Sequence, residues 1–428
     1  MRKTSVITAG VLAFGASLAT FSAAQAQGPV PRADPPLRLQ PRPVGQVLKI
    51  PKITLSPAAV ERIWVGKFTA AFMARCADHA VGCAVAAIGS SGVTSEAADG
   101  AARRAPDFAP RAMTAGDVIT MASVSKTFTA ATLLKIISDK KVIVNGKPTA
   151  ISVDDKIAPY LPKSWTLSEP AKTLTFRQLL RHQSGLECGG ISYAQLKTCF
   201  ATTKLDGAKT YHNENFADMR MIIPIMYGSP VRVNMTDMLA KEAAGDPGPI
   251  AAYYGARYRS IVNTVVFSKA GLPTLECKVQ GRAPALSYKS ATTHKWDFSS
   301  VLPGESWGDM SDYCGSQGWF MSARQMAAAM RAINTPGLVM PAAALTQMQG
   351  EQLGVYASGD LGKGVSSWSH GGYHPAEWNK GEINTIIVHF SNGVSAGVIV
   401  NSPYKGATVD AGGDLWGDLV QAALTAGP

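Results

Sequence analysis

Residues 121–128 read Met-Ala-Ser-Val-Ser-Lys-Thr-Phe and open an apolar, helix-forming run that continues to Ser138. On a helix, residues three positions apart share a face, so the Lys126 amine can reach the Ser123 hydroxyl. A serine hydroxyl is a poor nucleophile until a base takes its proton, and a lysine serves as that base only when burial or neighbouring cations lower its pKa. The segment therefore predicts a nucleophile and an enclosed base within one helical turn.

A second motif, Tyr211-His212-Asn213, supplies polar partners for this pair. Tyr211 can share the proton, either as a phenolate that nearby positive charge stabilises or as a relay toward the leaving group. Asn213 can orient Lys126 and the amide or ester of a substrate. His212 occupies the variable middle position and is expected to be peripheral.

A third motif, His370-Gly371-Gly372, lies near the C-terminus. His370 can add a cationic or hydrogen-bonding group. The two glycines let the backbone approach a bound substrate closely, which marks Gly371 and Gly372 as substrate-binding positions. We expect the backbone N–H groups of Ser123 and Tyr373 to form an oxyanion hole.

Together these motifs resemble the serine β-lactamase and penicillin-binding-protein superfamily. The resemblance is to the branch with class C β-lactamases, D-alanyl-D-alanine carboxypeptidases, D-aminopeptidases and related esterases, whose motifs are S-x-x-K, Y-x-N and K-T-G or H-x-G. Residues 179–186 (Leu-Leu-Arg-His-Gln-Ser-Gly-Leu) and 318–323 (Gly-Trp-Phe-Met-Ser-Ala) are similar to further segments of that branch, and the likeness runs roughly from Glu61 to Leu424. It implies an α+β fold, in which an antiparallel β-sheet flanked by N- and C-terminal helices joins a mostly helical subdomain.

The apolar patterns agree with that fold. Helical periodicity runs from Ala58 to Phe72, residues 81–88 and 383–390 and 396–400 are strand-like, and 415–424 predict a closing helix. Strands at both ends of the chain predict one shared sheet. We expect a catalytic domain over 58–428, with 58–122 and 320–428 forming the sheet subdomain and 123–319 the helical one. Ser123 is expected at a helix N-terminus in the cleft between them.

The N-terminus indicates export. Arg2 and Lys3 precede an apolar run, and Ala24-Gln25-Ala26 is typical of a cleavage site, so residues 1–26 predict a signal peptide and a secreted or periplasmic protein. Residues 27–57 are rich in proline and predict a leader outside the core. No second long apolar run follows, so we expect no membrane span in the mature form.

Six cysteines in an exported chain suggest disulfides, although some could be buried thiols and many pairings are possible. Nearest-neighbour pairing gives Cys76 with Cys83, Cys188 with Cys199, and Cys277 with Cys314. The formal net charge of +11 comes from scattered basic residues without interleaved aromatics, and nucleic acid is therefore not an expected partner.

We therefore expect a serine hydrolase that forms an acyl-enzyme on a small ester, amide or peptide substrate, of esterase or D-amino-acid amidase or peptidase type. It needs no cofactor and no metal. The alternatives are a β-lactamase or D-alanyl-D-alanine carboxypeptidase, and a silent protein that only recognises cell-wall peptides. The resemblance departs from the lactamase pattern at His370 and Gly371, which stand where many β-lactamases have lysine and threonine. No class A-type general-base glutamate can be assigned, and Met226 to Tyr258 has no clear counterpart in the family.

Other readings of single motifs are weaker. Residues 304–308 match G-x-S-x-G, but the preceding and following residues do not predict the strand and helix that a nucleophile elbow needs, so a loop is expected. His370 and His374 have the spacing of metal ligands on a helix, which Gly371 and Gly372 oppose. Ser125 is expected to be structural, and His182 to fix the turn after a helix.

Overall fold

The strands near the two ends of the described chain build one sheet, as predicted. In the computed structural model, which describes residues 55–144, 147–205, 210–228, 235–281, 283–289, 302–375, 380–404 and 413–427, the strand order is β3-β2-β1-β11-β10-β9-β8 with antiparallel neighbours. The strands are β1 (Gly82–Ile88), β2 (Thr94–Arg103), β3 (Arg111–Ala112), β8 (Tyr356–Ser358), β9 (Ser367–His374), β10 (Ile383–Phe390) and β11 (Ser395–Val400). The predicted signal peptide 1–26 and nearly all of the leader 27–57 lie outside the described residues.

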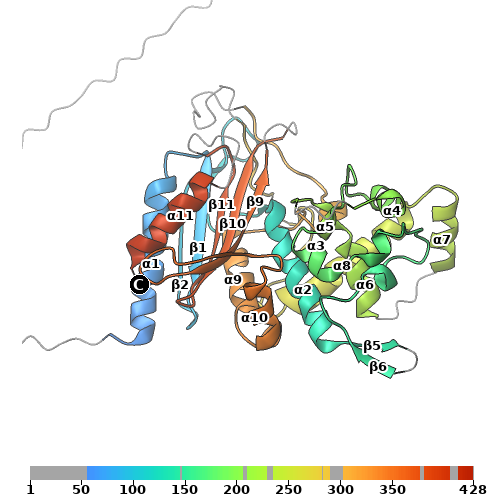
Figure 1. The fold of residues 1–428 in the computed structure, drawn as a ribbon. Helices are drawn as coiled ribbons and strands as arrows, with labels where there is room; N and C mark the ends of the chain where they lie inside the picture. Colours follow the sequence, from blue (N-terminus) through green and yellow to red (C-terminus); the bar gives the residue numbers. More distant parts are fainter. Residues whose placement is uncertain are drawn as a thin grey trace, which may run out of the picture. The chain divides into compact units, whose positions relative to one another are not determined.

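Helices from the two ends of the described chain cover one face of this sheet. The predicted helices are α1 (Pro57–Cys76) and α11 (Gly413–Ala426), and they lie side by side (Figure 1). Ser56 accepts a hydrogen bond from the Ala59 N–H and caps α1. Trp64 and Phe68 stack with ring centroids 5.2 Å apart, and both meet the edge of Phe390 on β10. This aromatic cluster joins the N-terminal helix to a C-terminal strand, which is why sequence-distant segments share one core.

The opposite face of the sheet packs against α9 (Ala323–Ile333). Alternate residues of β1 point to the two faces: Val85 contacts the α1 and α11 side, while Ala84 and Ala86 contact the α9 side. Gly397 on β11 allows α9 to come close, since a Cβ there would lie 2.5 Å from the Ala323 carbonyl oxygen. Burial on both faces explains why β1 and β11 read as continuous apolar runs.

The middle of the chain is mostly helical (Figure 1). Its helices are α2 (Ser125–Asp139), α3 (Phe176–Leu180), α4 (Tyr193–Thr202), α5 (Glu214–Ala217), α6 (Met219–Tyr227), α7 (Met235–Ala243) and α8 (Gly248–Val262), and α10 (Ala342–Gly350) follows α9. Two short sheets accompany them: β5 (Lys141–Val144) with β6 (Lys147–Ala150), and β4 (Ile119–Thr120) with β7 (Phe320–Met321). Helix α2, which carries Lys126, is buried on nearly all sides, and Ser123 lies just before it.

Part of the stretch from Met226 to Tyr258, which had no expected counterpart, forms α7 and most of α8. Glu242 of α7 accepts hydrogen bonds from Tyr193 and Lys197 of α4, which attaches α7 to the helical region. Within the described ranges, no helix is both long and apolar enough to cross a membrane.

Candidate active site

The nucleophile candidate lies in a tight turn just before α2. Ser123 belongs to a 3-10 turn, Ala122–Val124, that runs into the helix. The preceding Met121 is held on two sides, because its N–H donates to the Trp319 carbonyl (3.0 Å) and its carbonyl accepts from Thr385 Oγ1 (2.8 Å). Ala122 is forced to a φ of 49°, a left-handed conformation that alanine rarely adopts. Strain held in place by its surroundings is typical of functional turns.

Strand β9 runs directly against this turn. A Cβ built on Gly372 would lie 2.3 Å from the Met121 carbonyl oxygen and 3.2 Å from the Ser123 nitrogen. Glycine at this position is therefore a packing requirement, and it brings the backbone of β9 beside the Ser123 N–H. The pairing of Gly372 with Thr385 on β10 fixes the register of this contact.

Lys126 is the centre of the site. Its Nζ lies 2.9 Å from Ser123 Oγ, 2.7 Å from Asn213 Oδ1 and 2.9 Å from the Ser316 carbonyl oxygen. The side chain is fully buried. Burial holds the pKa of Lys126 well below the ordinary lysine value, and the charge of Glu214 opposes this only in part. A buried amine with a lowered pKa is what a base for serine requires.

Tyr211 closes the site on another side. Lys126 Nζ lies 4.9 Å from the centre of its ring. The tyrosine presents 46% of its surface to solvent, yet desolvation raises the pKa of its phenol above the ordinary value, and a hydrogen bond with Ser123 opposes the rise. The phenol is therefore protonated at neutral pH. Of the two roles expected for Tyr211, the resting phenolate does not fit this environment.

His370 lies on β9 and is buried, with its Nδ1 2.6 Å from the Gly371 carbonyl oxygen. Burial, with a smaller effect of Lys126, lowers the pKa of His370 to about 3. The imidazole is thus neutral near pH 7, so of the two roles expected for His370 the cationic one does not fit this environment. Its remaining role is that of a neutral hydrogen-bonding group.

Ser123, Tyr211, Asn213 and His370 line one cleft of about 670 Å³. Tyr373, Gly371 and Gly372, which were predicted from sequence, also line it. The full lining consists of Ser123, Tyr211, Asn213, Gln317, Tyr356, His370, Gly371, Gly372, Tyr373, Pro375, Asn384, Thr385, Ile386 and Leu415. A second cleft of about 620 Å³ shares Asn213 and Gln317 with it and reaches Trp307 and Lys380. Among the described residues, no group of three or more His, Cys, Asp or Glu could hold a metal ion.

His182 has more contacts with the site than the turn-fixing role that the sequence predicted. It does lie in the turn after α3, with a φ of 53°, but its ring also stacks on Tyr211. Its Nδ1 accepts the His212 N–H (3.3 Å), and burial lowers the pKa of His182 to about 3. Glu214, next to Asn213, was missed as well: it is buried, and it accepts the Cys188 N–H. The signal for His182 was its place in the 179–186 segment, whereas Glu214 had none.

The remaining residues singled out from sequence are those of the G-x-S-x-G match, His374 and Ser125. Ser306 of the G-x-S-x-G match is exposed, in a stretch outside regular helices and strands. Trp307 beside it stacks on His374 at 4.1 Å, and His374 is fully buried. Ser125 Oγ accepts the Trp319 N–H, a structural role as expected.

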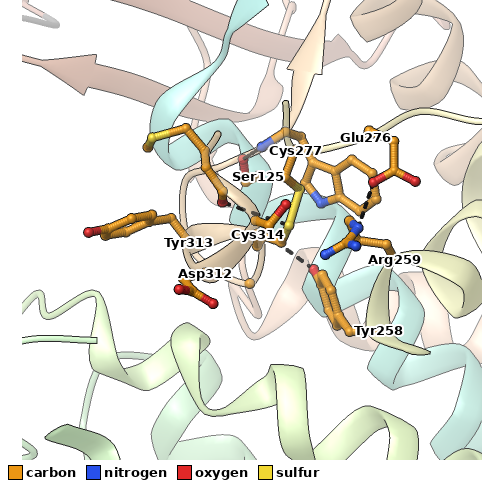
Figure 2. The surroundings of a disulfide bond; sticks show 12 residues. Ser125, Tyr258, Arg259, Glu276, Cys277, Asp312, Tyr313 and Cys314 are labelled. Atoms are coloured by element: carbon orange, nitrogen blue, oxygen red, sulfur yellow. Dashed lines mark hydrogen bonds and ion pairs between the residues drawn. A yellow bond between two sulfur atoms is a disulfide. The ribbon is translucent and has the colours of Figure 1, made fainter. Parts of the chain in front are cut away.

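All three predicted cysteine pairs form disulfides: Cys76 with Cys83, Cys188 with Cys199, and Cys277 with Cys314. Figure 2 shows the surroundings of the third, where Tyr258 of α8 reaches Cys314 and Arg259 pairs with Glu276 at 2.6 Å. The described chain has no free cysteine. Cys188 of the second disulfide donates its N–H to Glu214, next to Asn213, and Cys314 of the third lies two residues before Ser316.

Several solved structures share this arrangement of elements. A D-amino acid amidase from Ochrobactrum anthropi SV3, complexed with D-phenylalanine, is 17% identical with a TM-score of 0.57, over 83% of this chain and 99% of the other. A class C beta lactamase from Rhodobacter sphaeroides is 16% identical with a TM-score of 0.53, over 84% and 99%. A beta-lactamase/D-alanine carboxypeptidase from Yersinia pestis is 15% identical with a TM-score of 0.56, over 86% and 100%. At these identities the likeness shows the fold alone.

The sheet, its covering helices and the helical insertion define a β-lactamase/transpeptidase-like fold. The model of the family described as Beta-lactamase matches residues 67–414, and the chain therefore belongs to the beta-lactamase family, a family of hydrolases. No curated protein sequence matches the chain.

Proposed function

We propose that this protein is a serine hydrolase that forms an acyl-enzyme on small ester or amide substrates, of esterase or D-amino-acid amidase or peptidase type. One observation carries the proposal. The fully buried Lys126 amine, with its lowered pKa, lies 2.9 Å from the Ser123 hydroxyl. Neither a structural lysine nor a simple binding pocket requires a neutral amine in contact with a serine at the end of a strained turn.

In the acylation step, Ser123 Oγ forms a bond to the substrate carbonyl carbon while its proton passes to Lys126 Nζ. The negative charge on the carbonyl oxygen is accepted by the backbone N–H groups of Ser123 and Tyr373 in the cleft. The bond to the leaving oxygen or nitrogen then breaks, and the Tyr211 hydroxyl gives that atom its proton. The Lys126 ammonium returns a proton to Tyr211, which restores the phenol.

Hydrolysis of the acyl-enzyme reverses this proton flow. Water attacks the acyl carbon, and its proton passes through Tyr211 and Lys126 to Ser123 Oγ as the acyl bond breaks. A neutral Lys126 and a protonated Tyr211 are the states that their environments favour, so this route starts from the resting site without a change of protonation.

The substrate class is supported by the walls of the cleft. A β-lactam carboxylate calls for a cation near position 370, and the buried His370 is neutral near pH 7. The second cleft, which meets the first at Asn213 and Gln317, leaves room for an extended acyl or leaving group. Relatives in fold include the D-amino acid amidase above and EstCE1, a hydrolase with promiscuous acyltransferase activity (14% identical, TM-score 0.55, over 86% of this chain and 99% of the other).

A β-lactamase or D-alanyl-D-alanine carboxypeptidase is the second candidate, because proteins with those names share the fold. A substrate panel separates the two: short acyl p-nitrophenyl esters, D- and L-aminoacyl amides, and nitrocefin, each with wild-type protein and Ser123→Ala. Ser123-dependent turnover of esters or D-aminoacyl amides supports the proposal. Turnover of nitrocefin alone supports the second candidate, and the absence of both turnover and a fluorophosphonate adduct indicates a silent binding protein.

We also propose that the protein is exported with removal of residues 1–26. The three disulfides support this, because such bonds persist in oxidising compartments. N-terminal sequencing of the protein recovered from a periplasmic or culture fraction should begin at Gln27. An intact Met1 in that fraction contradicts the expected cleavage.

A further inference from the structure

The hydrogen bonds of Lys126 define where its lone pair points. A neutral amine has two N–H groups and one lone pair, and it has three partners here. The side-chain carbonyl oxygen of Asn213 and the main-chain carbonyl oxygen of Ser316 can only accept, whereas the Ser123 hydroxyl can donate. The two N–H groups therefore bind the two carbonyls, and the lone pair is left facing the Ser123 proton. The position of the Ser316 carbonyl is thus part of the base.

That carbonyl belongs to a short turn fixed by a disulfide. Cys314 lies two residues before Ser316 and is bonded to Cys277, and both cysteines are fully buried (Figure 2). The Cys277 carbonyl also accepts the Met310 N–H at 2.7 Å. The disulfide therefore ties the turn at a point next to the atom that contacts Lys126.

The turn is also fixed from the helical side. Thr129 of α2, one turn after Lys126, donates to the Gly315 carbonyl at 2.7 Å and forms a hydrogen bond with Tyr258 at 2.6 Å. A Cβ built on Gly315 would lie 2.3 Å from the Phe216 carbonyl oxygen. The turn is therefore held by the disulfide and by these contacts together.

We propose that Cys277 and Cys314 are positioning residues for acylation, whose disulfide holds the Ser316 carbonyl where it directs the Lys126 lone pair at Ser123. The proposal rests on the proposed serine hydrolase function. Its consequence is that this disulfide determines the rate of acyl transfer and not only the stability of the fold. A displacement of about 1 Å in such a constellation costs roughly a hundredfold in rate, so a partial displacement should cost about tenfold or more.

The sign of the pH effect follows from the main cause of the lowered Lys126 pKa, which is burial. A loosened turn lets water reach the amine, which raises its pKa toward the ordinary lysine value. The titratable groups around Lys126 are Tyr211 and Glu214 from the helical region, His182 after α3, and His370 and His374 on β9. The cysteine substitutions leave all of these in place.

The test compares two double variants of the full mature chain, Cys277→Ser/Cys314→Ser and the matched control Cys76→Ser/Cys83→Ser. The control disulfide joins the end of α1 to β1, outside the residues that line the cleft. The rate of acylation by a p-nitrophenyl ester is measured against pH in the burst phase. We expect the first variant to acylate about tenfold or more slowly than wild type at the pH plateau. The acid limb of its profile, where the rate rises with pH, should move to higher pH, while the control keeps the wild-type profile. Identical profiles for both variants overturn the proposal.

Folding is checked by circular dichroism and thermal melting. The Cys277→Ser/Cys314→Ser variant buries two new hydroxyl groups, which can destabilise the fold. The apolar variant Cys277→Ala/Cys314→Val is therefore measured as well. If neither folds, Thr129→Val removes the second anchor of the turn with the disulfide intact. For Thr129→Val we expect the rise of the acylation rate with pH to shift to higher pH in the same way. An unshifted pH profile in this variant would contradict the proposal. Wild-type protein without Ser123-dependent acylation refutes the proposed function itself, whereas normal wild-type acylation with an unchanged variant profile refutes this inference alone.

Discussion

His182 stacks on Tyr211 with ring centroids 4.2 Å apart and an interplanar angle of 29°. The contact holds the phenol beside Lys126, because the Tyr211 ring is otherwise nearly half exposed. It links the turn after α3 to Tyr211, the residue proposed to share the catalytic proton.

Replacing His182 tests this contact. His182→Ala removes the stacking partner and should lower kcat about tenfold, with a smaller change in KM, because the phenol is proposed to act in the transition state. His182→Phe retains an aromatic ring and should recover most of the loss. Steady-state kinetics on an ester substrate measure both variants. Equal losses in the two would mean that the imidazole, and not the stacking, is what matters.

Lys126→Ala should reduce acylation by roughly 10²- to 10⁴-fold while the protein still folds, since the lysine is the proposed base. Lys135 on the same helix is half-buried and forms an ion pair with Asp139, so Lys135→Ala serves as the matched control and should acylate normally. Intact-protein mass spectrometry after exposure to a fluorophosphonate follows the adduct over time. Wild-type labelling of Lys126→Ala would remove the lysine from the mechanism.

The pH dependence of acylation should show one acid limb from Lys126. The reaction needs the neutral amine, so the rate rises with pH and levels off below the ordinary lysine range, because burial lowers the Lys126 pKa. The pKa values of His182 and His370 are lowered to about 3, so neither should add a limb between about pH 5 and pH 8. A limb in that window that disappears in His370→Gln would contradict the neutral imidazole.

Gly372→Ala should inactivate the enzyme by crowding. The new Cβ would meet the Met121 carbonyl oxygen and Thr385 Oγ1 at 2.3 Å, and would push β9 away from the Ser123 N–H. We expect a loss of about a hundredfold in kcat/KM. At Gly371 the nearest atom to an added Cβ is 4.0 Å away, so Gly371→Ala should lose far less. Similar activities for the two alanine variants would show that the close approach is unimportant.

Asp218→Asn should stabilise the protein at neutral pH. Asp218 is fully buried between α5 and α6, and burial raises its pKa well above the ordinary value. Above about pH 4 the unfolded state loses this proton and the folded state keeps it, so stability falls as pH rises. The asparagine variant lacks that slope, and its melting temperature should exceed that of wild type by about 1–3 °C at pH 7, with no gain near pH 3.

The exposed Asp154 serves as the control, because its pKa is shifted in the opposite direction to that of Asp218. Its ion pair with Arg177 lowers its pKa, so Asp154→Asn should give no gain in melting temperature at neutral pH. A gain at pH 7 in Asp154→Asn equal to that in Asp218→Asn would rule out burial of the carboxyl as the cause.

Much of the fold was predictable because its signals are local or periodic. The apolar periodicity after Ala58 predicted α1, and the continuous apolar runs at 81–88 and 383–390 predicted strands that are buried on both faces. The pairing of Ser123 with Lys126 was predictable for the same reason, since three residues along one helical turn fix their separation.

The features of the candidate site that the sequence did not predict depend on main-chain atoms or on burial. The Ser316 carbonyl has no residue signature, because any residue presents the same oxygen. The protonation states of His370 and Tyr211 depend on desolvation, which only the packed neighbours determine, and of the two roles expected for each residue these environments favour the neutral imidazole and the protonated phenol.

Residue types and their spacing along the chain were enough to predict the family, an antiparallel sheet shared by the two ends of the chain with its flanking helices, and the contact between Ser123 and Lys126, because each follows from motif spacing, backbone periodicity or short-range geometry. Tertiary structure decided which way the lone pair of Lys126 points, which imidazoles are neutral, and how closely β9 approaches Ser123. These properties arise from contacts between segments up to a few hundred residues apart, and the electrostatic cost of burial is set only when those segments pack together.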